Sequence, residues 1–166
     1  MNHYIIDGNN LIGKIKSLST AKKKDKQQSR EGLVNLLNGF FAGKKCNHTL
    51  HLDGHANTPL HLSKGKIIYS EKHTSDYFIR SEIDNSKNSK QIILVSSDHS
   101  LMNYAKVNSC TIIKSEDFAK QLQTKYEINI ESDAVKQLER EKSFFLDKFM
   151  NKWSVDLDII ILDFRG

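Results

Sequence analysis

Three separate apolar stretches of this chain each end in an aspartate, and this repetition limits the fold more than any other feature of the sequence. The aspartates are Asp7, Asp53 and Asp98. A short apolar run that ends in a polar residue predicts a buried β-strand. Segments with helical spacing of apolar residues lie between the runs, and strands that alternate with helices favour a parallel sheet. The carboxyl ends of parallel strands meet at one edge, so we expect the three carboxylates to lie close together.

The whole pattern predicts an α/β fold with a central, mainly parallel sheet of five strands. Residues 91–98 contain a continuous apolar run, which indicates a strand that is buried on both faces. The strongly basic segment 21–26 is expected to be a loop or the start of a helix near the cleft. The predicted strands are 3–7, 48–53, 66–70, 91–98 and 111–113, and the predicted helices are 11–18, 29–41, 74–84, 101–107, 115–126 and 132–153.

Residues 131–166 are expected to form a C-terminal helix and a tail that pack on the same domain as the rest of the chain. Phe145, Phe149 and Trp153 have helical spacing and are expected in the core. The tail 155–162 alternates apolar and acidic residues before a solid apolar run, which predicts an extra strand. That strand could extend the sheet edge or pair with another chain.

The charge of the chain is unevenly distributed. Residues 1–115 carry 17 Lys and Arg against 9 Asp and Glu, whereas residues 116–166 carry 8 against 11. A basic surface around an acidic pocket suits a polyanionic substrate whose chemistry needs metal ions. A basic surface that only aids solubility explains the charge, taken alone, equally well.

The sequence lacks the signals of a membrane or secreted protein. No apolar stretch is long enough to span a bilayer, and Asp7 interrupts the N-terminal apolar run, unlike in a signal peptide. Cys46 and Cys110 lack the spacing of metal ligands and are expected to be core thiols in a reducing compartment. We therefore expect a cytoplasmic protein.

A fourth acid, Asp76, lies in the first turn of a predicted helix and should join the three strand-end aspartates. Four like charges repel one another unless cations or shifted pKa values relieve them. Oxygen-only ligands suit Mg²⁺ or Mn²⁺, and two such ions can activate a water and stabilise the leaving oxygen of a phosphodiester. Independent helix caps explain the same residues about as well. Because His51, Asp53 and His55 alternate, a His-Asp-His metal site is a further alternative.

Four short motifs, residues 7–10, 52–55, 69–76 and 95–98, together resemble the YacP-like branch of the NYN family, whose members are PIN-like nucleases. The resemblance covers the order of elements from residue 3 to about residue 126. It implies a PIN-like three-layer fold over residues 1–130 with strand order 3-2-1-4-5. It also implies metal-dependent cleavage of RNA by an endoribonuclease that uses Mg²⁺ or Mn²⁺.

The resemblance also implies roles for single residues. Asp7, Asp76 and Asp98 correspond to the acidic positions that bind metal and act in catalysis, with Asp53 beside them. The family often has a second acid directly after the position of Asp76, where this chain has Tyr77. That departure leaves one carboxylate fewer and bears on whether one or two ions bind. Other polar residues complete the implied site around the acids: Asn10, Ser96, Ser97 and His55.

RNA is the partner that the resemblance implies, and some relatives act on translating ribosomes. Basic residues near the acidic strand end or on the helix of Asp76 are the candidates for RNA contacts, although a solvated face explains any one of them. They are Lys14, Lys16, Lys22, Lys23, Lys24 and Arg80.

Two other functions are compatible with the sequence. The first is a catalytically weak RNA- or ribosome-binding module with a degraded site, which Tyr77 favours, although Glu71 or Glu82 could replace the missing acid. The second is a phosphatase or phosphotransferase with Asp7 as nucleophile, against which Asn9 counts because an Asp-x-Asp motif would be expected there.

Overall fold

The protein, described here from a computed structural model, is built on one sheet of five parallel strands. The structure describes residues 1–56 and 58–163, with side chains to residue 150. The order of strands in the sheet is β3-β2-β1-β4-β5, which confirms the predicted α/β class and strand order. The strands are β1 (His3–Asp7), β2 (Asn47–Leu52), β3 (Gly65–Tyr69), β4 (Ile92–Val95) and β5 (Thr111–Ile113).

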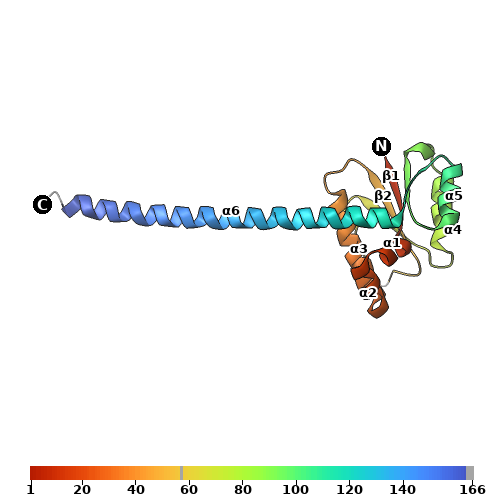
Figure 1. The fold of residues 1–166 in the computed structure, drawn as a ribbon, viewed down its shortest axis with the longest axis horizontal. Helices are drawn as coiled ribbons and strands as arrows, with labels where there is room; N and C mark the ends of the chain where they lie inside the picture. The colour runs from red at the N-terminus through yellow and green to blue at the C-terminus, as the bar shows by residue number, and fades with distance from the viewer. Residues whose placement is uncertain (57, 164–166) are drawn as a thin grey trace. The chain divides into compact units, whose positions relative to one another are not determined.

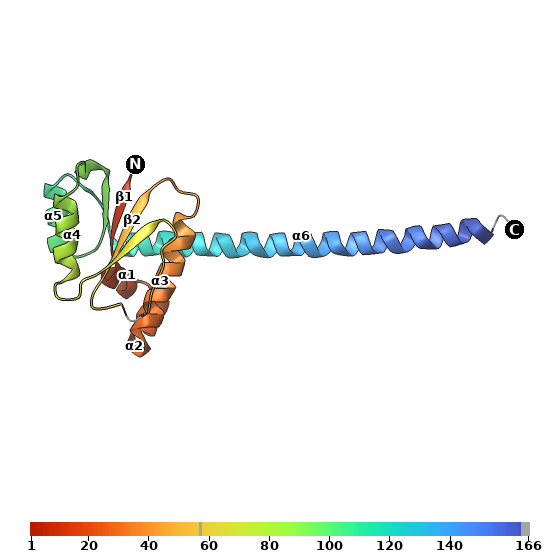
Figure 2. The same cartoon turned by 180° about the vertical axis from the view of Figure 1, so that it is seen from behind.

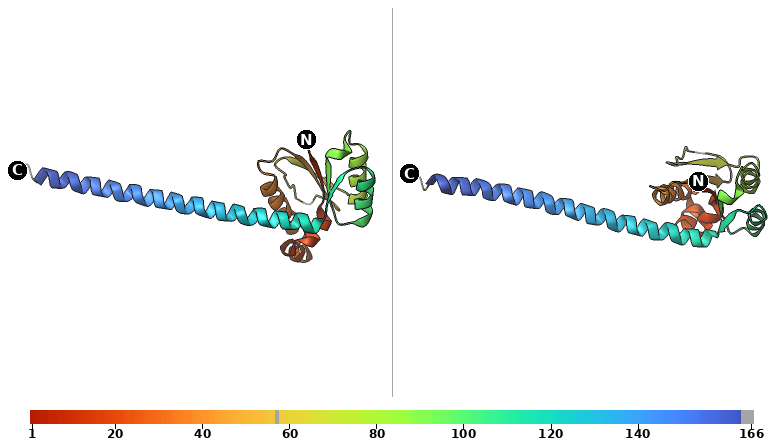
Figure 3. Two further views of the ribbon diagram at one scale, coloured as in Figure 1. Left: turned by 45° about the horizontal axis from the view of Figure 1, so that its top comes forward. Right: turned by 90° about the horizontal axis from the view of Figure 1, so that it is seen from above.

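Helices connect the strands and form two outer layers. Figure 1 shows α4 and α5 on one side of the sheet and α1, α2 and α3 on the other, and the turned views of Figure 2 and Figure 3 agree. The helices are α1 (Gly8–Lys14), α2 (Lys16–Lys24), α3 (Lys26–Phe41), α4 (Ser75–Asp84), α5 (His99–Val107) and α6 (Ser115–Asp163), with a single 3₁₀ turn, η1 (Ser89–Gln91).

The basic segment 21–26 contains the end of α2 and the start of α3, so of its two predicted forms the start of a helix is closer to the structure than the loop. Lys22, Lys23 and Lys24 form the last turn of α2, and α3 begins at Lys26. Asp25 separates the two helices and caps α3, because its carboxylate accepts a hydrogen bond from the backbone N–H of Gln27 at 2.7 Å. A run of exposed lysines suits a solvated helix as well as a loop, since Lys has a high helix propensity.

Strand β1 lies at the centre of the sheet and alternates its side chains between the two layers. Ile6 belongs to the core that α1, α2, α3 and the start of α6 cover. Ile5 belongs to the second core, under α4 and α5. The register places Asp7 beside His51 of β2 and Ile6 beside Val95 of β4. The end of β1 is therefore flanked by both neighbouring strands.

The junction between β1 and α1 requires a glycine. A Cβ atom on Gly8 would lie 2.6 Å from Leu52 Cδ2 and 2.8 Å from the carbonyl oxygen of His51. Since real Cβ atoms do not approach backbone that closely, only glycine lets α1 begin directly against the end of β2. This contact fixes where Asp7 emerges from the sheet.

In the C-terminal part of the chain, the helix bounds, the strand and two core positions differ from those predicted. Residues 1–126 and 127–166 form two compact units, and α6 belongs to both. The two predicted helices 115–126 and 132–153 are one continuous helix, and the predicted strand 155–162 is wrong because α6 extends to Asp163. Phe145 and Phe149 are 72% and 52% exposed, against their predicted place in the core. The side chain of Trp153 lies outside the described residues.

Candidate active site

Two adjacent strands, β1 and β4, each deliver an aspartate to the same edge of the sheet. Asp7 caps α1 by accepting a hydrogen bond from the backbone N–H of Asn10 at 3.2 Å. Asp98 caps α5 in the same way, accepting from the N–H of Leu101 at 2.9 Å. Each carboxylate uses only one oxygen, Oδ1, for its cap. The two alternatives for these residues, helix caps and an acidic cluster, are therefore compatible.

Asp7 is the most buried acid of this edge, at 6% exposure. Burial raises the pKa of its carboxyl group, and the negative charges of Asp76 and Asp53 raise the pKa further. Hydrogen bonds from Asn10 and from the hydroxyl of Ser96 act in the opposite direction without reversing the shift. The surroundings of Asp7 therefore disfavour its charged form.

Asp76 extends the acidic edge from the first turn of α4. Burial raises the pKa of its carboxyl group, as do the charges of Asp98 and Asp53, while Arg80 lowers it. The guanidinium of Arg80 donates to Ser100 Oγ at 2.7 Å and lies over the ring of Tyr104. Asp76 thus interacts with acids from two strand ends, and the four aspartates form one electrostatic group.

Asp53 differs from the other acids because the protein already satisfies its carboxylate. Burial alone would raise its pKa, but hydrogen bonds from Ser75, Asn9 and Ser70 outweigh burial and lower the pKa. Both the backbone N–H and the hydroxyl of Ser75 donate to one carboxylate oxygen. The side chain of Asn9 donates to the other. Asp53 is therefore held in place as a charged group.

The polar residues beside the acids connect the two strand ends. Ser96 Oγ donates to Asp7 Oδ2 at 3.0 Å and accepts from the backbone N–H of Asp98 at 3.1 Å. The side-chain oxygen of Asn10 accepts from the N–H of Ser97 at 3.2 Å. The hydroxyl of Ser97 turns away from the acids and donates to Glu116 of α6.

The acidic edge has the chemistry of a cation site. Among the described side chains, no three His, Cys, Asp or Glu lie close enough together to hold a metal ion as they stand. The donors are nonetheless all carboxylates, and the raised pKa values of Asp7 and Asp76 show that added positive charge would be favourable. Carboxylate oxygens are the ligands that Mg²⁺ and Mn²⁺ prefer.

Glu82 does not join the acidic edge. Its carboxylate accepts hydrogen bonds from Thr49 at 2.7 Å, from His51 at 2.7 Å and from His3 at 2.9 Å. Burial would raise the pKa of Glu82, but these partners lower it to about 2. Glu82 therefore cannot supply the acid missing at Tyr77. His51 contacts Glu82, whereas His55 is exposed and receives a hydrogen bond from Arg30 only at its backbone carbonyl.

The basic candidates from the sequence lie in different surroundings. Lys14 forms an ion pair with Glu116 at 2.7 Å. Lys16, Lys23 and Lys24 are exposed on α2. Lys22 differs from these lysines because it lines a pocket on the flank of the acidic edge.

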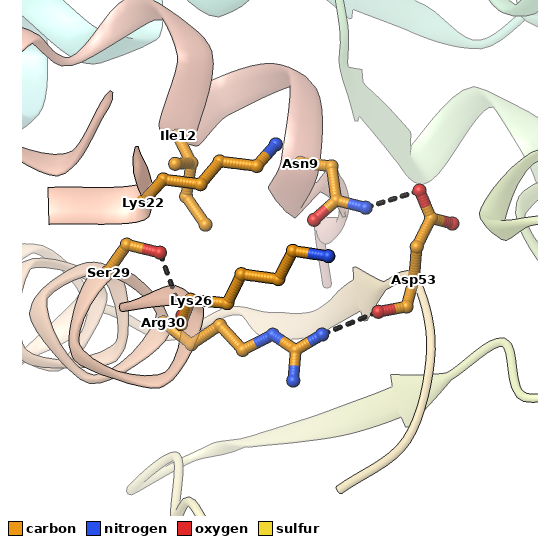
Figure 4. A pocket seen from close by; sticks show the side chains of 7 residues that line it. All are labelled: Asn9, Ile12, Lys22, Lys26, Ser29, Arg30 and Asp53. Carbon is orange, nitrogen blue, oxygen red and sulfur yellow. Dashed lines mark hydrogen bonds between the residues drawn. The ribbon is translucent and has the colours of Figure 1, made fainter. Parts of the chain in front are cut away.

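Three of the residues that line this pocket, which Figure 4 shows, were not identified from the sequence. Lys26, Ser29 and Arg30 line the pocket from α3. Their spacing of three and four residues places them on one face of a helix. That spacing, directly after the basic run, was the signal that could have revealed them.

The fold is similar to that of a protein of known structure. The crystal structure of Rae1 (YacP) from Bacillus subtilis matches with a TM-score of 0.67 and 18% identity over 95% of this chain and 98% of that one. The crystal structure of a mutant of the same Bacillus subtilis protein matches with a TM-score of 0.66 and 18% identity over 81% and 82%. No helix of the described chain is long and apolar enough to cross a membrane.

Sequence comparison gives the family. None of the curated proteins matches the chain. The model of the YacP-like NYN domain matches residues 4–159. The chain therefore belongs to the family of YacP-like NYN domains, which are PIN-like domains of the nuclease type.

Proposed function

We propose that this protein is a divalent-metal-dependent endoribonuclease whose active site is the acidic edge of the sheet. The observation that carries the proposal is the electrostatic coupling of Asp7, Asp76, Asp53 and Asp98, in which burial and mutual repulsion raise the pKa of the first two. A cluster of this kind is costly to keep without a cation. Membership in a nuclease-type family, whose members generally use divalent metals, supports the same function.

Asp7, Asp76 and Asp98 are the residues that would hold Mg²⁺ or Mn²⁺. The ion would lower the pKa of a bound water and stabilise negative charge on the leaving oxygen of the phosphodiester. Asp53 would contribute its charge from the side, because its oxygens already accept hydrogen bonds from Ser75 and Asn9. Water attack on phosphorus in line with the 3′-oxygen predicts products with a 5′-phosphate.

Ser96 and Asn10 would position the metal-binding carboxylates. Ser96 contacts Asp7 through its hydroxyl hydrogen and the backbone of Asp98 through its oxygen. Asn10 ties α1 to the backbone of Ser97. These contacts hold the ends of β1 and β4 in one arrangement, which is the usual task of groups that surround metal ligands.

The test is the Asp7→Asn substitution, which removes one charge while keeping the size of the side chain. Labelled RNA is incubated with each pure protein in Mn²⁺, in Mg²⁺ or in EDTA. We expect cleavage by the wild type with either ion and none in EDTA, and a loss of roughly a hundredfold or more in Asp7→Asn. Asp133→Asn, at an exposed position of α6, is the matched control and should cut at the wild-type rate.

A binding module that does not cleave is the second candidate, because Tyr77 occupies the position where the family often has an acid. Tyr77 is 55% exposed and stacks on His73 with a ring distance of 4.7 Å, beside Asp76. Aromatic side chains in such positions stack on nucleobases. RNA that binds to the protein and stays intact with both ions would establish this function and exclude the nuclease.

A further inference from the structure

The pocket on the flank of the acidic edge has a cationic lining that the acids do not neutralise. Its volume is about 170 Å³. Figure 4 shows the cationic ends of Lys22, Lys26 and Arg30 directed toward Asn9 and Asp53. Its lining consists of Asn9, Ile12, Lys22, Lys26, Ser29, Arg30 and Asp53.

Arg30 gives the pocket a fixed, buried charge. The residue is 7% exposed, and its guanidinium donates to the backbone carbonyls of Asp53 at 2.5 Å and of His55 at 3.1 Å. These carbonyl oxygens accept hydrogen bonds from two of the N–H groups but carry no full negative charge. Arg30 forms no ion pair within the described part of the chain. A buried cation with neutral partners favours the arrival of an anion.

Lys22 and Lys26 add two further cations to the lining. Neither ammonium forms an ion pair with any described carboxylate. Asp53 is the acid nearest to them in the lining, but its two carboxylate oxygens already accept hydrogen bonds from Ser75, Ser70 and Asn9. The three cations therefore outnumber the one acid of the pocket.

The chemistry of the lining selects a phosphate group over other parts of a nucleic acid. None of its seven residues is aromatic, so the pocket provides no surface on which a base could stack. Ser29, which is 1% exposed, and Asn9 add neutral polar groups. Two lysines and an arginine around a small polar cavity are typical of sites that bind phosphate.

We propose that this pocket binds a phosphate group of the RNA substrate next to the bond that is cut; the proposal rests on the proposed function. Asn9 and Asp53 form the wall that the pocket shares with the acidic edge, since Asn9 lies two residues after Asp7 and Asp53 accepts hydrogen bonds from Ser75, the residue before Asp76. A strand with its scissile phosphate at the acids presents its next phosphate nearby. The bound group is either an internal diester or a 5′-terminal monophosphate.

Two double variants with equal loss of charge test the pocket. Lys22→Gln/Lys26→Gln removes both lysines of the pocket, and Lys23→Gln/Lys24→Gln removes two exposed lysines that do not line the pocket. RNA affinity is measured by fluorescence anisotropy in EDTA, where no cleavage occurs, over a series of salt concentrations. We expect the pocket variant to bind about tenfold more weakly. Its salt slope should fall by about 0.7, as for one lost phosphate contact.

In the control variant, the loss of RNA affinity should be less than half of that in the pocket variant, measured as the logarithm of the dissociation constant. Equal losses in the two variants would overturn the proposal, because the lysines would then act only through net charge. This outcome is separate from failure of the proposed function. If the wild type never cuts RNA but the pocket variant binds RNA more weakly, the proposed function fails and the phosphate site remains. If the wild type cuts RNA and the pocket variant binds RNA as tightly as the wild type does, only the phosphate site is rejected.

Modified RNAs distinguish the two sources of phosphate. One arm compares 5′-phosphate with 5′-hydroxyl ends, and the other replaces single internal diesters by neutral methylphosphonates. A modification that weakens binding by the wild type about tenfold, but leaves Lys22→Gln/Lys26→Gln unaffected, identifies the bound group. If every modification affects the wild type and the pocket variant equally, the pocket binds no phosphate of the RNA.

Discussion

Two of the acids on helix α4, Asp76 and Glu82, have pKa values that are shifted in opposite directions. Burial and neighbouring carboxylates raise the pKa of Asp76. The pKa of Glu82 falls to about 2 despite its burial, because three side chains donate to its carboxylate. The two residues are six positions apart in the sequence, which amounts to about 9 Å along the helix. Burial acts in the same direction on both acids, and only the neighbours of Glu82 reverse its effect on the pKa.

The protein satisfies the carboxylate charge at one of these two acidic sites and leaves it largely unsatisfied at the other. Around Glu82 the fold provides Thr49, His3 and His51, so the charge is satisfied and the cluster holds α4 against β1 and β2. Around Asp7 it provides only two hydrogen bonds and further negative charge. An open site of this kind is expected where function needs a cation, at some cost in stability.

The largest expected difference between the sites is their response to Mg²⁺ or Mn²⁺. An ion at one hundred times its dissociation constant should stabilise the wild type by about 2.7 kcal/mol. Asp7→Asn should lose most of this gain, while Glu82→Gln should keep it. Thermal unfolding with and without the ion measures both. An equal response in the two variants would mean that the ion does not bind at the acidic edge.

The next largest effect is the loss of stability in Glu82→Gln. A glutamine cannot serve as the charged acceptor for His51, His3 and Thr49, so we expect the free energy of unfolding to fall by about 2 kcal/mol. Urea unfolding in EDTA measures it. Glu139→Gln, at an exposed position of α6, is the control and should change stability by less than about 0.5 kcal/mol. A Glu82→Gln protein as stable as this control would contradict the comparison.

The effect of Asp7→Asn on the free energy of unfolding should have the opposite sign to that of Glu82→Gln and should be smaller. Without metal, removal of the Asp7 charge relieves its repulsion with Asp76 and Asp53, and Asn still accepts hydrogen bonds through its side-chain oxygen. We expect a gain of about 1 kcal/mol in the same urea experiment in EDTA. A loss of stability in metal-free Asp7→Asn would show that Asp7 is satisfied by the fold.

The smallest expected effect is the pH dependence of the stability differences between the wild type and the variants Glu82→Gln and Asp7→Asn. The folded pKa of Glu82 lies below its ordinary value of 4.5, so its stabilisation is present above pH 4.5 and is lost as pH falls toward 2. The folded pKa of Asp7 lies above its ordinary value of 3.8, so its charge begins to cost stability as pH rises above 3.8.

Unfolding of both variants between pH 7 and pH 4 checks these signs. The deficit of Glu82→Gln relative to the wild type should begin to shrink as pH falls below 4.5. The advantage of Asp7→Asn should shrink over the same range, because protonation then removes the charge that the substitution removes. If the stability deficit of Glu82→Gln relative to the wild type grows on acidification, the pKa of Glu82 is not lowered in the folded protein.

The strand ends could be predicted from the sequence because each depends on a local pattern. An apolar run that ends with Asp7, Asp53 or Asp98 can be recognised from the local sequence alone. The parallel order then brings these ends to one edge through known rules of connection. The tail 155–162 was predicted wrongly as a strand, and the basic segment 21–26 was predicted as either a loop or the start of a helix, since an apolar run and a lysine run each suit more than one local structure.

The surroundings of each acid could not be predicted, because they depend on residues distant in the chain. Glu82 was considered as a replacement acid, and only its contacts with His3, Thr49 and His51 show its separate role. The pocket likewise combines Asn9 with residues of α2 and α3 and with Asp53. Sequence spacing gives a face of a helix, but the depth of Arg30 emerges only from the packed structure.

The central place of β1 has a consequence for how the chain folds. His3 pairs with Asn47 on one side and with Ile92 on the other, so the first strand of this sheet in chain order is among the last to be fully paired. Such distant pairing slows folding and leaves the apolar side chains of Ile5 and Ile6 exposed in the meantime. All five strands precede α6, so the sheet can close while that helix is still being synthesised. During translation, the interval before β4 emerges is when we expect the nascent chain to depend most on chaperones.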